Sequence, residues 1–163
     1  MKKGSFRLRR ATRRDVPEIL RLVRALAVYE KLSHQAIATA TGLRKTLFGR
    51  KPAAEVLLAI SDRRVVGFAL YFQNYSTFLG KPGVYLEDLF VEPAFRGRGI
   101  GKALLEEIAR LAVERGCGRF EWSVLDWNER AIGFYESMGA TVMPEWRICR
   151  LTGDALRSCA AGR

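Results

Sequence analysis

Two adjacent acids, Glu87 and Asp88, lie inside an apolar, strand-like run, YLEDLFV, near the middle of the sequence. Both faces of this run are mainly apolar, which predicts a central strand of a sheet. Alternation along a strand places Glu87 on one face with Leu89 and Val91, and Asp88 on the other. Burying a carboxylate is costly unless it is paired, hydrogen-bonded or open to a cleft. Taken alone, the two acids fit salt bridges to the many arginines as well as they fit catalysis.

The loop after this strand is basic and rich in glycine. It reads RGRGIGK over residues 96–102 and runs directly into an amphipathic helix predicted over 100–115. Glycines permit close approach to the backbone, and bare N–H groups at a helix N-terminus form a cradle for an anion. Arg96, Arg98 and Lys102 add full charges. The loop is not a Walker A motif, because Arg96 replaces its leading glycine, nor GxGxxG, because Lys102 replaces the third glycine. A strand, this loop and a helix together predict a phosphate-binding site.

A second constellation is the run LDWNERAIGFYESMGA. Asn128 is well placed to cap a helix over 128–138. Tyr135 lies seven residues further on, about two helical turns, and therefore shares nearly the same face as Asn128. From these residues alone, a core aromatic beside Phe134 is the better explanation of Tyr135.

The remaining sequence alternates predicted strands and helices and predicts a mixed α/β fold in one domain, 1–163. We expect strands near 6–9, 55–60, 65–73, 84–91, 119–125 and 145–151, with a loop over 74–83. We expect helices over 13–29, 40–48, 100–115 and 128–138, and a short terminal helix capped by Thr152. Thr12 and Asp15 are spaced as a capping box.

Composition narrows the classes of function. The 163 residues include 28 basic and 17 acidic ones, for a net charge of +11. This charge fits a solvated basic face as well as it fits a polyanionic partner, either a nucleic acid or a phosphate-rich cofactor. Charge alone does not separate these two partners. No apolar run approaches a membrane span, and MKKGSFRLRR is not followed by the apolar segment of a signal peptide. The three cysteines suit reduced thiols in the cytoplasm, and the single histidine, His34, argues against a His-rich metal site. We expect no metal.

Three stretches carry a resemblance to a known family: LRRATRRD, LFVEPAFRGRGIGKALL and WSVLDWNERAIGFYESMGA. Together they resemble the GNAT superfamily of acyl-CoA-dependent N-acetyltransferases over nearly the whole chain. Within it, YLEDLFV and WNERAIGFYESMGA are similar to the spermidine/spermine (diamine) branch, which includes thialysine acetyltransferases. The resemblance implies a single-domain GNAT fold, in which a twisted mixed sheet flanked by helices has two splayed central parallel strands. It also implies acetyl-CoA as co-substrate and a homodimer formed through the C-terminal strands.

The resemblance also implies roles for particular residues. The family's general acid matches Tyr135, and Glu87 matches the carboxylate that helps to deprotonate the amine. The residues matched to the cofactor site are Leu89, Phe90 and Val91 for the pantetheine arm, Arg96, Gly97, Arg98, Gly99, Ile100, Gly101 and Lys102 for the pyrophosphate, and Asn128, Glu129, Arg130 and Ala131 on the other flank. The residues matched to the amine pocket are Tyr29, Glu30, Glu87, Asp88 and Trp146.

The chemistry of amide formation fits these roles. A primary amine with a pKa near 10.4 must lose a proton before it attacks, and a partly buried carboxylate is a suitable acceptor. We expect direct transfer in a ternary complex without an acyl-enzyme. The excess positive charge repels long polyamines, so a lysine-like amine or a short diamine is at least as well supported, with Arg147 as a candidate partner for a substrate carboxylate. A protein N-acetyltransferase and a non-catalytic acyl-CoA sensor stay open as alternatives. We expect no nucleic-acid partner, because Phe6 is the only aromatic residue within the basic N-terminus.

Overall fold

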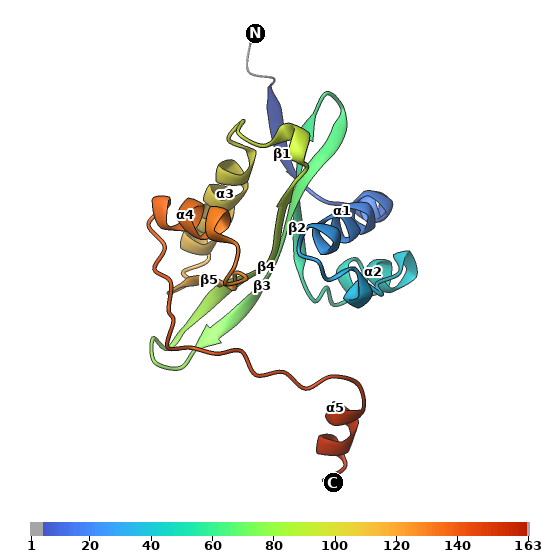
Figure 1. Ribbon diagram of the computed structural model, residues 1–163, viewed down its shortest axis with the longest axis vertical. Helices are drawn as coiled ribbons and strands as arrows, with labels where there is room; N and C mark the ends of the chain where they lie inside the picture. The colour runs from blue at the N-terminus through green and yellow to red at the C-terminus, as the bar shows by residue number, and fades with distance from the viewer. Residues whose placement is uncertain (1–4, 163) are drawn as a thin grey trace. The chain divides into compact units, whose positions relative to one another are not determined.

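The computed structural model describes residues 5–162 (Figure 1). The chain divides into two compact units, with the boundary between Ser123 and Val124. Five strands in the first unit form one sheet in the order β1-β2-β3-β4-β5. They are β1 (Phe6–Arg10), β2 (Glu55–Ser61), β3 (Arg64–Ser76), β4 (Lys81–Val91) and β5 (Phe120–Trp122). Neighbours from β1 to β4 are antiparallel, whereas β4 and β5 are parallel, which confirms the predicted mixed sheet.

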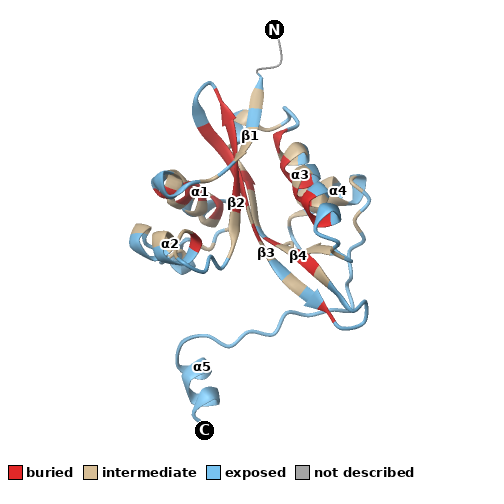
Figure 2. Ribbon diagram, turned by 180° about the vertical axis from the view of Figure 1, so that it is seen from behind, coloured by how far each residue is buried: buried red, intermediate tan, exposed pale blue. Residues whose placement is uncertain are grey.

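Helices cover both faces of this sheet. The α-helices of the first unit are α1 (Val16–Tyr29), α2 (Ala40–Leu47) and α3 (Ile100–Glu114), and its short 3-10 turns are η1 (Arg13–Asp15), η2 (Ser33–Gln35) and η3 (Pro93–Phe95). Figures 1 and 2 show α1 and α2 on one face and α3 on the other. The periodic apolar positions predicted from the sequence face the sheet, as Ile19 of α1 and Leu104 of α3 are fully buried. Strands β2 and β3 therefore form the buried centre of the unit (Figure 2).

The entry to α1 is fixed by the predicted capping box. The Thr12 N–H donates to a carboxylate oxygen of Asp15 at 2.7 Å. Both terminal nitrogens of Arg9 bind the same carboxylate, at 2.8 and 2.7 Å. The hydrogen bonds from Arg9 hold the pKa of Asp15 well below its usual range. The carboxylate of Asp15 is thus bound by Arg9 of β1 and by Thr12 at the start of the turn.

Two of the expected strand boundaries in this unit are wrong. Most of the predicted loop 74–83 is strand, because β3 and β4 remain paired from Asn74 opposite Gly83 to Ser76 opposite Lys81. Only a short turn remains, in which Gly80 has a φ of +62° that suits glycine. Strand β5 is shorter than the predicted 119–125, since its pairing with β4 ends at Trp122.

The second unit contains α4 (Glu129–Ser137) and α5 (Gly153–Ala160). Thr152 occupies the N-cap position of α5, as predicted, but its side chain makes no capping hydrogen bond. The strand predicted over 145–151 is wrong: the segment has no regular secondary structure and is exposed throughout. A strand needs a neighbour for its main-chain groups, and no described residue pairs with this segment. No helix in the described part of the chain has both the length and the apolar character needed to span a membrane.

Candidate active site

The central strand β4 loses one of its neighbours halfway along its length. Strand β5 pairs with β4 only from Val84 to Leu86, whereas β4 pairs with β3 as far as Val91. Beyond Leu86, within the described residues of the sheet, the other edge of β4 has no strand beside it. Strand β5 itself ends at Trp122, so β4 continues without a parallel neighbour at the place where the splay of two strands was predicted.

The direction of the main-chain groups at this open edge follows from one hydrogen bond. The Glu92 N–H donates to the Val66 carbonyl at 2.9 Å, on the β3 side. Successive N–H groups of a strand point to opposite edges, so those of Leu89 and Val91 point to the open edge and that of Phe90 points to β3. The predicted contacts to a pantetheine arm thus have donors available at Leu89 and Val91.

A β-bulge lies directly before this segment. Leu70 of β3 is opposite Asp88 and Tyr71 is opposite Leu86, so Glu87 is an extra residue in β4. A bulge interrupts the strict alternation of side chains that the sequence predicted. Glu87 is exposed, while Asp88 is largely buried. The two acids therefore differ in environment, although they are neighbours in sequence.

Two other carboxylates affect the titration of Asp88. Burial, together with the negative charges of Glu87 and Glu30, raises the pKa of Asp88 to about 7. Burial also raises the pKa of Glu30, which follows the last residue of α1. A carboxyl group that titrates near neutrality can both accept and release a proton under physiological conditions.

Arg96 connects this acidic region to the glycine-rich loop. Its Nε donates to the Val91 carbonyl at 2.9 Å. Its guanidinium carbon lies 4.6 Å from the centre of the Tyr29 ring and 5.5 Å from that of Phe90. These contacts hold the end of α1, the end of β4 and the start of the loop together. Arg96, predicted to take part in the pyrophosphate site, thus also has a positioning role that its sequence context did not indicate.

The loop itself has the geometry of an anion cradle. Gly97 and Gly99 have φ angles of +74° and +83°, values that glycine adopts without strain. Gly99 is the N-cap of α3, and its carbonyl accepts the first helical bond, from Ala103, at 3.0 Å. The N–H groups at positions 100–102 precede this first bond and have no partner within the helix. Arg98 donates to the Ala94 carbonyl at 3.1 Å, and Lys102 lies 3.7 Å from Glu106.

The remaining predicted residues belong to the second unit. Asn128 caps α4 as predicted, accepting from the Ala131 N–H at 3.3 Å. The rings of Tyr135 and Phe134 lie 5.3 Å apart. Glu129 and Arg130 occupy the first turn of α4, and Trp146 is 72% exposed. The predicted proximity of Tyr135 and Trp146 to the acids of β4 stays a prediction.

Sequence comparison identifies the family. The model of the Acetyltransferase (GNAT) family matches residues 18–140, which include the open edge of β4, the glycine-rich loop and α4. The chain belongs to the GNAT family. Members of this family are N-acetyltransferases that use acetyl-CoA as co-substrate, and this chain is accordingly an N-acetyltransferase.

Several relatives of this GNAT chain have named substrates. An L-ornithine N5-acetyltransferase of Arabidopsis thaliana is 42% identical, with 93% of this chain and 86% of that protein covered. A thialysine N-epsilon-acetyltransferase of Mus musculus is 40% identical over 96% of this chain and 98% of that protein. A spermidine/spermine N(1)-acetyltransferase-like protein of Homo sapiens is 33% identical, covering 95% of this chain and 24% of the longer protein. The predicted resemblance to this part of the GNAT superfamily is confirmed.

Solved structures confirm the fold. An integron cassette protein from the mobile metagenome of V. cholerae superposes with a TM-score of 0.81 at 27% identity, covering 96% of this chain and 98% of the other. An aminoglycoside acetyltransferase from a soil metagenome superposes with a TM-score of 0.76 at 22% identity, covering 90% and 95%. At 22% identity, the similarity to the aminoglycoside acetyltransferase shows a shared fold alone.

We expect the substitution Asp88→Asn to stabilise the protein at about pH 8 but not at about pH 5. An aspartate titrates near 3.9 when unfolded, and the pKa of about 7 in the folded state means that stability falls as pH rises between these values. Asparagine carries no charge and escapes this loss. The melting temperature of both proteins as a function of pH measures the effect, with the exposed Glu106→Gln as control. Equal melting temperatures across this range would show that the carboxyl group of Asp88 titrates normally.

Proposed function

We propose that this chain transfers the acetyl group of acetyl-CoA to a primary amine of a small basic molecule, by direct attack in a ternary complex. The observation that carries the proposal is the cluster of Glu30, Glu87 and Asp88 beside the open edge of β4. A cationic amine is attracted to such a cluster, and the open edge offers main-chain donors to the other substrate. The two substrates would thus meet along one strand.

The co-substrate would be held by main-chain groups. Leu89 and Val91 would bind the pantetheine arm, and the amides from Gly97 to Lys102, after Arg96, would bind the pyrophosphate. The family match extends through Asn128, Glu129, Arg130 and Ala131, which supports their predicted place on the other flank. Acetyl-CoA supplies the activated thioester, and an N–H of the strand would stabilise the negative charge that develops on its carbonyl oxygen.

The acids would prepare the amine. An amine with a pKa near 10.4 arrives protonated, and Asp88, with a pKa of about 7, is suited to take up its proton. Glu87, the carboxylate first assigned to this step, is exposed and suited to relay the proton to solvent. Tyr135 would donate a proton to the departing thiolate. No covalent acyl-enzyme is needed.

Among small amines we favour a basic amino acid of about the size of ornithine or thialysine over a long polyamine. Two of the relatives at 40% identity or more are named for these amino acids. The net charge of +11 opposes the approach of a polycation, whereas a substrate carboxylate lessens this repulsion. Tyr29 and Trp146 would line the amine pocket, and Arg147 is our candidate for binding the carboxylate.

The chain is further proposed to act as one domain and as a homodimer in the cytoplasm. The family match crosses the boundary between the two units, which supports a single domain with one cooperative unfolding transition. Cys117, Cys149 and Cys159 are free thiols, as expected in a reducing compartment. The exposed C-terminal segment contains large apolar side chains, among them Val142, Met143, Trp146, Ile148 and Leu151. Such a segment is suited to pair with a second copy of the chain.

The release of CoA from acetyl-CoA with a panel of amines tests the reaction. The panel contains ornithine, lysine, thialysine, putrescine, spermidine, spermine and short peptides. We expect preferential turnover of a basic amino acid and a loss of about 100-fold or more in kcat for Tyr135→Phe. Tyr75→Phe is the matched control, because Tyr75 is an exposed tyrosine of β3. Turnover confined to peptides would overturn the proposed substrate class, and full activity of Tyr135→Phe would remove its role as acid.

Sedimentation velocity tests the dimer. We expect the full chain to sediment as a dimer and Trp146→Glu with Ile148→Glu to sediment as a monomer, because the added charges oppose burial of the segment. Val113→Glu is the control, since this residue is an exposed apolar side chain of α3. A wild-type protein that sediments as a monomer at all concentrations would contradict the proposal.

A further inference from the structure

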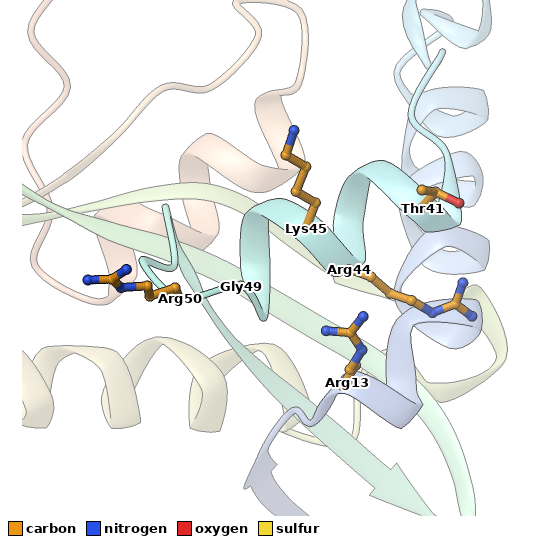
Figure 3. A pocket seen from close by; sticks show the side chains of 6 residues that line it. All are labelled: Arg13, Thr41, Arg44, Lys45, Gly49 and Arg50. Carbon is orange, nitrogen blue, oxygen red and sulfur yellow. The ribbon is translucent and has the colours of Figure 1, made fainter.

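A second charged site lies in the first unit, built by η1, α2 and the residues that follow α2. A concavity of about 490 Å³ is lined by Arg13, Thr41, Arg44, Lys45, Gly49 and Arg50. Figure 3 shows these residues along α2, from Thr41 near its start to Arg50 beyond its end, with Arg13 of η1 beside Arg44. The concavity is lined by four cationic side chains and no acid. The proposed acetylation reaction uses none of these residues.

No carboxylate neutralises this cluster. Residues 31–54 contain neither aspartate nor glutamate. The acids of η1 and of the first turn of α1 are paired with other arginines. Asp15 binds Arg9, and an Oε atom of Glu18 lies 2.8 Å from a terminal nitrogen of Arg21. Across residues 5–162, the four cations at the concavity form no ion pair, whereas many other arginines of the first unit do. The four cations therefore repel one another, and a bound anion would reduce this repulsion.

The backbone positions that carry these cations, which are exposed except for the half-buried Arg44, are fixed on both sides of the concavity. The capping box of Thr12 and Asp15 fixes η1, which carries Arg13. Leu43 and Leu47 of α2 pack against the core, so that Arg44 and Lys45 lie beside buried positions of a fixed helix. Gly49 brings the chain close to this helix, since a Cβ there would lie 2.3 Å from the Lys45 carbonyl. This approach is open to glycine alone, and it places Arg50 at the same concavity.

We propose that this concavity is a binding site for a small anion that carries two or more phosphate groups. Its volume of about 490 Å³ lies within the range of small-molecule sites. Three guanidinium groups and an ammonium group match several phosphate charges, and guanidinium groups bind phosphate oxygens in pairs. The Thr41 hydroxyl adds a neutral donor. The site lies on the α1–α2 side of the sheet, whereas the loop before α3 is on the other side (Figure 1).

Inorganic tripolyphosphate is the probe for this site. Isothermal titration calorimetry on the full chain, with and without saturating CoA, measures its affinity while the loop before α3 is free or occupied. We expect Arg13→Ala with Arg44→Ala to weaken binding about tenfold or more under both conditions. Arg24→Ala with Arg63→Ala is the matched control, since it removes the same charge from two exposed arginines elsewhere in the unit. We expect the control to change the affinity by about twofold or less.

Each other outcome decides against the proposal. Equal weakening in the control would mean that net charge alone attracts the anion. Loss of the signal with CoA would place the anion at the cofactor loop. Binding of a DNA duplex but not of tripolyphosphate, with the same dependence on Arg13 and Arg44, would replace a small-molecule site by a nucleic-acid surface. Circular dichroism confirms folding of each variant, and Lys45→Ala with Arg50→Ala gives an independent second pair.

Discussion

The end of β5 opposite Leu86, halfway along β4, is the constraint on which the candidate site depends. Main-chain N–H and C=O groups of a central strand are normally satisfied on both edges, and leaving them without partners is costly. At the place where the strand leads into the glycine-rich loop, the N–H groups of Leu89 and Val91 face no neighbouring strand, although the Val91 carbonyl accepts a hydrogen bond from Arg96. A partner with its own amide groups can complete the ladder that the sheet leaves open. The proposed cofactor site would thus rest on an interruption of the sheet's own hydrogen bonding.

The acids occupy the start of this open segment for a related reason. The extra residue at Glu87 interrupts the pairing with β3 at the point where the pairing with β5 ends. Glu87 is exposed there, while Asp88 is largely buried next to two other negative charges. Arg96 then joins the end of α1 to the end of β4 through Tyr29 and Val91. The proposed amine pocket and the proposed phosphate loop are consequently held by the same side chain.

The fold and the glycine-rich turn into α3 could be predicted from local patterns, because periodic apolar residues, the capping box at Thr12 and the glycines before α3 act over a few residues. The bulge at Glu87 could not, because it depends on the register between β3 and β4. The strand predicted over 145–151 failed for a similar reason: its apolar residues favour a strand, but pairing requires a neighbour that these described residues lack. The role of Arg96 depends on a contact with Tyr29, which is 67 positions away in sequence and which no local pattern indicates.

The exchange of backbone amide hydrogens along β4, with and without acetyl-CoA, tests the central claim most directly. We expect the N–H groups of Leu89 and Val91 to exchange much more slowly when acetyl-CoA is bound, because the co-substrate would complete their hydrogen bonds. The Phe90 N–H, which faces β3, is the internal control and should change little. Unchanged exchange at Leu89 and Val91 in protein saturated with acetyl-CoA would contradict the account and would place the co-substrate away from this edge.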